Sequence, residues 1–530
     1  MTFKYFNKTI FTAGLTAVLF LTSCEKDLDR MPESEITSAS VYADFSNYKL
    51  VLAKVYAGLA VSGQNGGDGD PDIGGIDGGT SNYLRQYFQL QELPTDEAVV
   101  AWNDPSLPDL HNMNWSANND FIRAMYYRIY YQIAISNEFI RETTDEKLAS
   151  RNITGENAET SRLYRNEARF MRALSYYHAI DLFGNGPFVT EQSEVGITPP
   201  PRIERAALFT YIESELKDIE NLLKDPRTNE YGRADKAAVW MLLSKLYLNA
   251  EIYTGQSRAS DARIYAEKVI NAGYSLKPNF AELFLADNNI ANNEVIFSVN
   301  YDGISTRTYG GTTYIIHAGV GGTMPTDQFG INSGWGGLRS TKSIVNLFPD
   351  TNGTLDKRGR FYSDGQNLEI NNQTEFTDGY PLIKFKNLKR DGSKGSDVSG
   401  LYVDTDFPLF RLGEAYLIYA EAVLRGGGGS TATAIQYINQ LRQRAYGNNL
   451  GNVTSINLDF ILDERARELT WEATRRTDLI RFGKFTTGTY LWPFKGGVKD
   501  GRAVENFRNI YPIPNTDLTA NPNLIQNPGY

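Results

Sequence analysis

Aromatic side chains gather in two stretches of the chain, residues 61–112 and 300–404, that are otherwise rich in glycine, aspartate, proline and asparagine. Their rings are Tyr83, Tyr87, Phe88, Trp102, Tyr301, Tyr309, Tyr314 and Trp335. Loops this long inside a folded protein are usually functional or disordered, and the aromatic content argues against disorder. Rings in loops can stack on flat ligands such as sugars. The residues alone also allow the interpretation that Trp102 and Trp335 are partly buried core aromatics.

Cysteine and histidine, which often bind metals or act in catalysis, are scarce in this chain. The chain has one cysteine, Cys24, and three widely separated histidines, His111, His178 and His317. A single cysteine excludes disulfides and thiolate zinc sites within one chain, and the histidine spacing excludes zincin-type pairs. Most metal-catalysed and cysteine-based chemistry is therefore excluded.

Two acidic stretches raise the question of calcium. Asp68-Gly-Asp70-Pro-Asp72 begins like a calcium loop, but Ile73 stands where an EF-hand needs glycine and Gly79 where it needs glutamate. The stretch Asp287 to Glu294 is a second candidate. We expect no cofactor, with a structural calcium ion as the alternative.

Composition and charge limit the classes of protein to which this chain can belong. Of the 530 residues, 41% are apolar and 22% charged, which is typical of a folded chain rather than a disordered one. The length suits several domains or one large repeat array. The formal charge of −10 argues against sequence-independent binding to nucleic acid, which requires a basic surface. We expect no nucleic-acid partner.

The first residues resemble an export signal. Lys4 and Lys8 precede an apolar run that is too short to cross a bilayer, and the run ends in Leu21-Thr22-Ser23-Cys24, which resembles a bacterial lipobox. In such signals the cysteine is acylated and becomes the first residue of the mature chain. The alternative is an ordinary signal peptide with an incidental cysteine.

We therefore expect a lipoprotein signal peptide over 1–23 and a lipidated tether over 24–40, with Cys24 as the lipidation site. Glu25, Lys26 and Asp27 resemble the acidic motif that sends lipoproteins to the cell surface. The body, 41–530, would be a single domain held at the outer membrane only by its lipid.

Helical periodicity dominates two blocks of the body, mainly 115–280 and 405–485. Apolar stripes at helical spacing are Phe170, Ala173, Leu174 and Tyr177; Leu412, Tyr416, Tyr419 and Val423; Ala434, Ile438, Leu441 and Ala445; and Leu462, Ala466, Leu469 and Ala473. Helix pairs with alanines at their crossings look like tetratricopeptide-type hairpins. We expect a mainly α fold: a tetratricopeptide-like scaffold with long aromatic-rich loop insertions, mainly 61–112 and 300–404, and a few short strands.

One face of the first block carries Arg165, Arg169 and Arg172. These arginines could bind an acidic ligand, but we expect them to pair with carboxylates of neighbouring helices. Our candidates are Glu464, Glu468 and Glu472, which repeat every four residues on one helix face.

Several motifs occur in an order that resembles the SusD/RagB family of surface glycan-binding lipoproteins. They are Arg172-Ala-Leu-Ser-Tyr-Tyr with Leu182-Phe-Gly-Asn-Gly-Pro, Gly232-Arg-Ala-Asp-Lys-Ala, Arg411-Leu-Gly-Glu-Ala-Tyr-Leu, Glu464-Arg465, Asp478-Leu-Ile-Arg-Phe-Gly483, Tyr511-Pro-Ile-Pro514 and Gln526-Asn-Pro-Gly-Tyr530. Each motif is weak alone, but their joint order together with a lipobox is specific.

Within the family, the nearest resemblance is to its starch-binding founder. It rests on Gly63 to Gly79, Glu92-Leu-Pro-Thr-Asp-Glu97, Thr308-Tyr-Gly-Gly-Thr-Thr-Tyr314 and Tyr490-Leu-Trp492. The resemblance implies an arc of three aromatics, Trp102, Tyr309 and Trp335, that cradles a curved α-glucan, with Arg85 bonding its hydroxyls. Pro105 stands where the family protein has an asparagine, and Asn103 and Asp104 are the candidates to replace that hydrogen bond.

The resemblance also implies a role without catalysis: capture of a starch-like α-glucan or maltooligosaccharide and its delivery to a TonB-dependent transporter of the SusC type. Two alternatives remain. A glycoside hydrolase acting on α-glucans needs only two suitably spaced carboxyl groups. A helical-repeat adaptor for peptide import would bind on its concave helix face instead of the loops.

Overall fold

The computed structural model describes residues 37–67, 69–196 and 198–530. The predicted signal peptide, Cys24 and most of the predicted tether lie outside these residues. The chain divides into two compact units, Met1–Tyr48 and Lys49–Tyr530. The described part of the first unit holds α2 (Ser38–Val41), and α3 (Ser46–Ala60) begins there and continues into the second. The predicted boundaries of tether and domain stay predictions.

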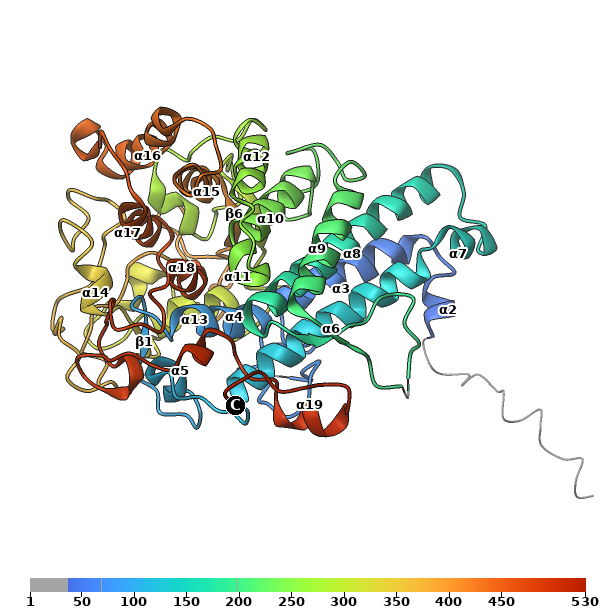
Figure 1. Ribbon diagram of the computed structural model, residues 1–530, viewed down its shortest axis with the longest axis horizontal. Helices are drawn as coiled ribbons and strands as arrows, with labels where there is room; N and C mark the ends of the chain where they lie inside the picture. The colour runs from blue at the N-terminus through green and yellow to red at the C-terminus, as the bar shows by residue number, and fades with distance from the viewer. Residues whose placement is uncertain (1–36, 68, 197) are drawn as a thin grey trace, which may run out of the picture. The chain divides into compact units, whose positions relative to one another are not determined.

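Strands in the second unit are few and short and helices are its main regular structure, which confirms the mainly α fold (Figure 1). They are α4 (Tyr83–Glu92), α5 (Pro108–Asn112), α6 (Asp120–Glu142), α7 (Asp145–Ser150), α8 (Gly155–Leu182), α9 (Arg205–Ile219), α10 (Lys236–Leu248), α11 (Ala250–Thr254), α12 (Ala259–Ile270), α13 (Gly311–Ala318), α14 (Lys342–Val345), α15 (Leu412–Leu424), α16 (Thr431–Tyr446), α17 (Leu458–Leu469), α18 (Arg475–Arg481) and α19 (Asn515–Ala520). Short 3-10 turns lie at Phe280–Phe284, Thr326–Phe329, Asn449–Gly451, Lys495–Gly497 and Asn506–Asn509.

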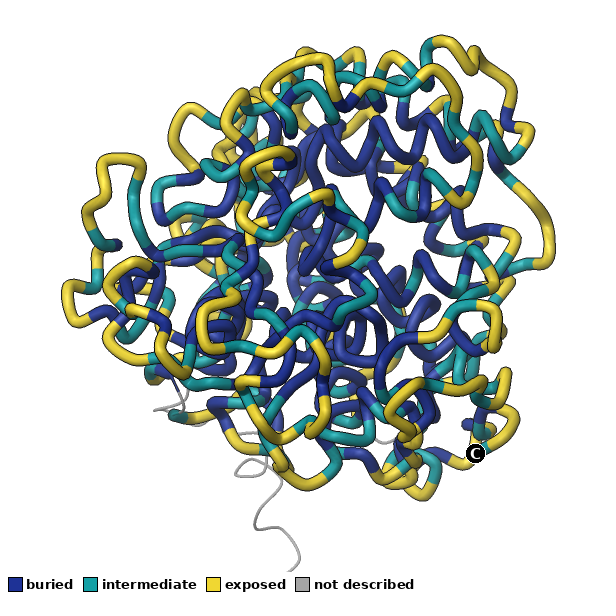
Figure 2. Tube along the Cα trace, turned by 90° about the vertical axis from the view of Figure 1, so that its left-hand side faces the viewer, coloured by how far each residue is buried: buried dark blue, intermediate teal, exposed yellow. Residues whose placement is uncertain are grey.

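The helices of the two predicted blocks pack in succession. Helix α8 packs on α6 and α9, α12 packs on α10 and α15, and α15 packs on α16 and α17. The predicted stripe from Phe170 to Tyr177 is buried, as are Ala434, Ile438 and Leu441. This is the packing expected of stacked helical hairpins, because each hairpin covers the apolar face of the next. Figure 2 shows the buried segments inside and the exposed turns at the periphery.

The strands are short and pair in three antiparallel two-stranded sheets. The pairs are β1 (Val99–Val100) with β5 (Leu338–Arg339), β2 (Gly186–Pro187) with β3 (Arg202–Ile203), and β4 (Val295–Val299) with β6 (Phe407–Arg411). The first pair joins the two stretches in which the sequence predicts binding loops.

Helix α4 lies inside the stretch 61–112, where the sequence analysis expected mainly loop. All ten of its residues are buried, and it packs against α6, α13 and α18. The side chain of Asn82 caps the helix by accepting a hydrogen bond from the backbone N–H of Arg85. Its apolar residues lie on one face and its polar residues mainly on the other, and both faces are buried because neighbours surround the helix.

Helix α17 ends earlier than its apolar stripe predicts. The stripe runs to Ala473, but the helix ends at Leu469, and both Trp471 and Ala473 have positive φ angles. The backbone N–H of Trp471 donates to Glu97 Oε2 at 2.9 Å, and its indole N–H donates to the Glu97 carbonyl at 3.1 Å. Glu97 therefore accepts a hydrogen bond from the backbone N–H of Trp471 that would have continued the helix, and its carbonyl also holds the indole.

The arginines of α8 form ion pairs, as predicted, but with other partners. Arg169 contacts Glu215 at 2.9 Å and Asp218 at 2.6 Å, and Arg172 contacts Glu215 at 2.6 Å. Arg165 pairs with Asp145. The prediction of Glu464, Glu468 and Glu472 as their partners is wrong. A largely buried cluster of Lys384 and five arginines takes those carboxylates instead: Arg358, Arg411, Arg442, Arg444 and Arg467.

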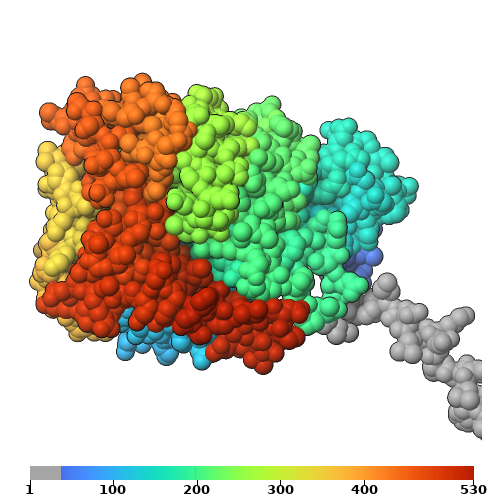
Figure 3. Space-filling view, in the orientation of Figure 1, coloured from blue at the N-terminus to red at the C-terminus, as the bar shows by residue number. Residues whose placement is uncertain are grey.

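The C-terminal segment follows α18 and runs along the surface of the second unit (red in Figure 3). Tyr511 anchors it, because its backbone N–H donates to Leu182 O and its hydroxyl donates to Leu90 O, both at 2.8 Å. The segment ends in the 511–530 motifs that the sequence analysis singled out.

Candidate functional site

The pairing of β1 with β5 brings two tryptophans together. Val99 lies opposite Arg339 and Val100 opposite Leu338, and the N–H of Ala101 donates to Gly337 O at 2.8 Å. Trp102 follows β1 and Trp335 precedes β5. The antiparallel register therefore places two residues that are distant in sequence at one edge of the sheet.

The three predicted rings form one contiguous group, which we call the aromatic cluster: Trp102, Tyr309 and Trp335. The ring centroids of Trp102 and Trp335 lie 6.4 Å apart with their planes inclined by 43°. Those of Tyr309 and Trp335 lie 6.2 Å apart and are inclined by 60°. All three side chains are half-buried. The structure thus brings the predicted rings together and leaves part of each accessible.

Neighbouring groups fix the orientation of the two indoles. The His317 ring stacks on Trp335 with the ring centroids 4.6 Å apart, and the backbone N–H of Trp335 donates to the His317 carbonyl at 2.8 Å. Burial lowers the pKa of His317, so the imidazole that supports Trp335 is neutral. A Cβ atom at Gly337 would lie 2.7 Å from the Trp102 indole, so this close approach requires glycine.

Sequence reasoning missed Tyr402, which adjoins the aromatic cluster. Its ring lies 5.5 Å from that of Tyr309, at 40°. Tyr402 stands in the predicted loop stretch 300–404, so composition alone placed it in the right region. No spacing in the sequence relates it to Tyr309, because the contact depends on how the loops fold back.

Arg85 lies behind the aromatic cluster, in the first turn of α4, and is 7% exposed. Its Nη1 donates to Gly79 O at 3.0 Å and to Tyr309 O at 3.3 Å, and its guanidinium lies 4.5 Å from the Tyr314 ring. Burial lowers the pKa of Arg85, partly offset by Tyr314 and Asp104. Among the described residues, no carboxylate lies within ion-pair distance of Arg85.

The residues after Trp102 are open to solvent. Asn103, Asp104 and Pro105 are all exposed. Within the described chain, the side chains of Asn103 and Asp104 have no hydrogen-bond partner, so both are available to a ligand. Asp104 lies close enough to Arg85 to influence its pKa. Their exposure is compatible with the hydrogen bonds to a sugar that the resemblance implies. Those roles stay predictions.

Comparison with known proteins identifies the family. A family model described as the SusD family matches residues 355–530. The starch-binding protein SusD of Bacteroides thetaiotaomicron is 38% identical to this chain, over 99% of both chains. This chain belongs to the SusD family. The SusD-like protein P2 of Formosa agariphila is 25% identical over 80% of this chain and 83% of its own.

Solved structures agree on the fold of this SusD-family protein. Surface glycan-binding protein A from Bacteroides uniformis superposes with a TM-score of 0.70 at 20% identity and covers 91% of this chain and 99% of its own. The Bacteroides thetaiotaomicron protein of the same name, in complex with laminarihexaose, gives 0.68 at 22% identity, with the same coverage of both chains. At these identities the likeness shows the fold alone.

Three of the carboxylates proposed for calcium pair with cations, while Asp70 accepts a hydrogen bond from the Asn65 amide. Asp72 contacts Lys54 at 2.9 Å, Asp287 contacts Arg390 at 2.9 Å, and Glu294 contacts Arg411 at 3.0 Å. Asp68 lies outside the described residues. Across the described ranges, no three His, Cys, Asp or Glu side chains gather as a metal site would require. The cofactor prediction stays a prediction.

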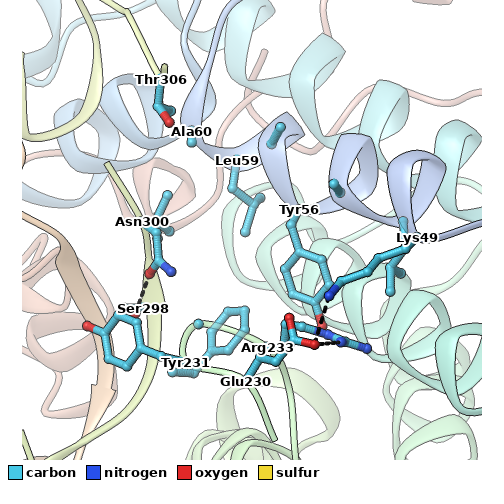
Figure 4. Close-up of a pocket in the computed structure, with 16 residues that line it drawn as sticks. Lys49, Tyr56, Leu59, Ala60, Glu230, Tyr231, Arg233, Ser298, Asn300 and Thr306 are labelled. Carbon is cyan, nitrogen blue, oxygen red and sulfur yellow. Dashed lines mark hydrogen bonds and ion pairs between the residues drawn. The ribbon is translucent and has the colours of Figure 1, made fainter. Parts of the chain in front are cut away.

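A separate cavity of about 290 Å³ lies between α3, the turn at 230–233 and β4 (Figure 4). Leu52, Leu59 and Phe297 form part of its apolar lining. Its charged groups pair with one another: Lys49 contacts Glu230 at 2.8 Å. No predicted site residue lines this cavity, so it is not part of the aromatic cluster.

None of the helices in residues 37–67, 69–196 and 198–530 has both the length and the apolar character that crossing a membrane requires.

Proposed function

We propose that this SusD-family protein binds a starch-like α-glucan or maltooligosaccharide on its aromatic cluster. The observation that carries the proposal is the meeting of Trp102, Tyr309 and Trp335, the three rings that the family resemblance assigns to one arc. The 38% identity to the starch-binding protein SusD supports the same ligand class.

The geometry of the rings favours a curved ligand. Neighbouring rings are inclined by 43° and 60°, so they form a bent surface and not a flat platform. A sugar packs its C–H face on each ring. An α-1,4-glucan coils and follows such a surface, whereas a straight β-1,4-glucan touches fewer rings.

Arg85, Asn103 and Asp104 would orient the sugar by hydrogen bonds. A guanidinium offers several donors, an amide offers both donors and acceptors, and a carboxylate accepts from hydroxyl groups. Tyr402 extends the aromatic surface beyond Tyr309. The proposed site therefore combines stacking for affinity with polar groups for orientation.

The proposed role does not include catalysis, and a direct test separates it from the hydrolase alternative. Purified protein incubated with soluble starch should release no new reducing ends. Steady, protein-dependent release of shorter sugars would favour the hydrolase.

We further propose that Cys24 carries a lipid that holds the protein at the outer surface, where it hands glycan to a SusC-type TonB-dependent transporter. Cys24→Ala should release the protein from the membrane fraction, while surface labelling of intact cells should detect the wild type. Co-purification of the transporter with the wild-type protein tests the partner.

Titration calorimetry tests the binding proposal. Maltoheptaose should bind, and cellohexaose should bind more weakly or not at all. Laminarihexaose is a necessary comparison, because a relative with the same fold was solved with it. A preference for laminarihexaose would keep glycan binding and overturn the α-glucan assignment.

A further inference from the structure

A second groove lies at the N-terminal half of α6 and shares no lining residue with the aromatic cluster. Its volume is about 590 Å³, within the range of ligand sites. Four segments far apart in the sequence line it: Ile73, Gly74, Tyr126, Tyr127, Tyr130, Pro187, Val189, Pro200 and Asp517. The Tyr127 hydroxyl lies 2.8 Å from Thr516 Oγ1, which ties α6 to α19 beside the groove.

One wall of the groove carries an unused hydroxyl group. Tyr126 is 1% exposed, and its hydroxyl has no hydrogen-bond partner among the described residues. Leaving a buried polar group without a hydrogen-bond partner costs stability. A ligand that supplies a hydroxyl group in this groove would remove that cost.

Asp517 provides a second polar group. Across the described ranges no Lys, Arg or His lies within 4 Å of its carboxylate, which accepts a hydrogen bond from Thr516 Oγ1 at 3.2 Å. Burial raises the pKa of Asp517, and its neighbours Thr516, Tyr127 and Arg123 oppose the rise. Because Thr516 donates only one hydrogen bond to this carboxylate, its other acceptor positions remain for a ligand.

Charge in the groove favours a neutral ligand. Arg123 opposes the approach of a cation to Asp517, yet it is itself engaged by Asp120 at 2.6 Å and by Gly75 O at 3.0 Å. No lysine or arginine lines the groove, so an anion would meet only the carboxylate. The remaining surface consists of tyrosine rings and apolar side chains.

We propose that this groove is a second saccharide site, in which a neutral glycosyl unit packs its C–H face on Tyr127 and Tyr130 and bonds Asp517 and Tyr126 through hydroxyl groups. The site goes beyond the proposed function. It rests on that function only for the choice of soluble starch as one of the polysaccharides tested. Two sites on one chain would strengthen the binding of long polysaccharides more than that of short ones, because the second contact becomes intramolecular.

The test uses the mature chain with the aromatic cluster disabled by Trp102→Ala and Trp335→Ala. Retardation in gels that contain soluble starch, dextran, mannan or xylan measures residual binding. We expect retardation by at least one of these neutral polysaccharides. Adding Asp517→Ala should weaken it by about 10- to 100-fold, as expected for losing a hydrogen bond to a charged group. Adding Tyr127→Ala should weaken it by a similar factor, as expected for losing a stacking ring.

Matched variants keep the result interpretable. Thr519→Ala alters an exposed residue of the same helix and should leave the retardation unchanged. Asp517→Asn keeps the shape and one acceptor, so it should weaken binding less than Asp517→Ala, and thermal unfolding of each variant confirms the fold.

Three outcomes overturn the second site: no retardation of the cluster-disabled protein in any gel, retardation that Asp517→Ala and Tyr127→Ala leave unchanged, or binding of an oligolysine peptide in place of the sugars. If the cluster-disabled protein is not retarded in any gel but the wild type is retarded by soluble starch, the proposed function stands and the second site does not. If disabling the cluster changes nothing and Asp517→Ala abolishes binding, the second site stands and the cluster is not the main site.

Discussion

The indole N–H of Trp102 donates to the backbone carbonyl of Trp335 at 3.0 Å, across 233 residues of sequence. This bond links the two stretches that carry the candidate site, in addition to the pairing of β1 with β5. One indole is thus held against the backbone of the other, so the spacing of the two rings is set by main-chain geometry. A site fixed in this way loses little conformational entropy when it binds a ligand.

Gly337→Ala should disturb the aromatic cluster without unfolding the protein. The new Cβ would lie 2.7 Å from the Trp102 indole, so that ring must move. The backbone at Gly337 has no positive φ angle, and alanine fits it otherwise. We expect α-glucan affinity to fall by about tenfold, measured by calorimetry.

Gly488→Ala is the matched control, because a Cβ there meets only Ala503 at 3.7 Å. It should leave affinity unchanged. Equal affinities in the two variants would show that the position of Trp102 does not matter for binding.

Arg85→Lys should weaken α-glucan binding by about tenfold while changing the free energy of unfolding little. The lysine keeps the charge, and its ammonium could replace Nη1, which donates to both Gly79 O and Tyr309 O. It lacks the other guanidinium nitrogens that would donate to a sugar, and the flat face that lies 4.5 Å from the Tyr314 ring. Arg307→Lys, an exposed change two residues before Tyr309, serves as the control. Wild-type affinity in Arg85→Lys would remove Arg85 from the site.

Asp406 should make stability fall as pH rises toward neutrality. Burial raises the pKa of Asp406 to about 7, opposed by a hydrogen bond from the Tyr301 N–H at 2.8 Å. Between the unfolded pKa of about 3.9 and the folded value, the folded state holds a proton that the unfolded state has released. The contribution of Asp406 is therefore fully present below about pH 4 and lost as pH rises through about 7.

Asp406→Asn removes this contribution, whose slope is at most about 1.4 kcal/mol per pH unit. Urea unfolding between pH 4.5 and 7.5 should show the wild type losing stability relative to the variant as pH rises. Asp500→Asn, at an exposed site, should follow the wild type. Parallel curves for wild type and Asp406→Asn would contradict this assignment.

Glu468→Gln should destabilise the fold by about 3–5 kcal/mol, since it breaks a buried ion cluster and leaves arginines without their charge partner. Glu468 is fully buried and contacts Arg411 at 2.7 Å, Arg358 at 3.1 Å, and Arg444. Denaturant unfolding measures the change.

The exposed pair of Glu369 with Lys342 offers a comparison at 2.8 Å. Glu369→Gln should cost no more than about 1 kcal/mol, because water screens that pair. A similar loss in both variants would mean that burial adds nothing to the cluster around Glu468.

The sequence predicted those parts of the fold that depend on local periodicity. The stripe from Phe170 to Tyr177 repeats at helical spacing and lies in a buried helix. Helix α4 was not predicted, because its apolar face of Tyr83, Leu84, Tyr87 and Phe88 belongs to a helix of only ten residues and follows a glycine-rich stretch that is typical of a loop. The end of α17 could not be predicted either, since it depends on Glu97, more than 370 residues away.

Prediction of the site had a similar limit. The types of Trp102, Tyr309 and Trp335, their loop setting and the family resemblance were enough to assemble the aromatic cluster. Tyr402 and the partners of Arg172 depend on long-range packing, for which the sequence carries no periodic signal. Glu464, Glu468 and Glu472 were rightly expected to pair, but helix spacing alone does not identify which arginines face them.

The most direct test of the central claim is the affinity of a cyclic maltooligosaccharide for wild-type protein and for Trp335→Ala, measured by calorimetry. Aromatic stacking on a nucleic-acid base is worth on the order of 1–3 kcal/mol, and we expect a similar value for a sugar, so losing the central ring should weaken binding by roughly 5- to 150-fold. The account predicts that loss, and weaker binding of cellohexaose by the wild type. Equal affinity in the two proteins, or a preference for cellohexaose, would contradict it.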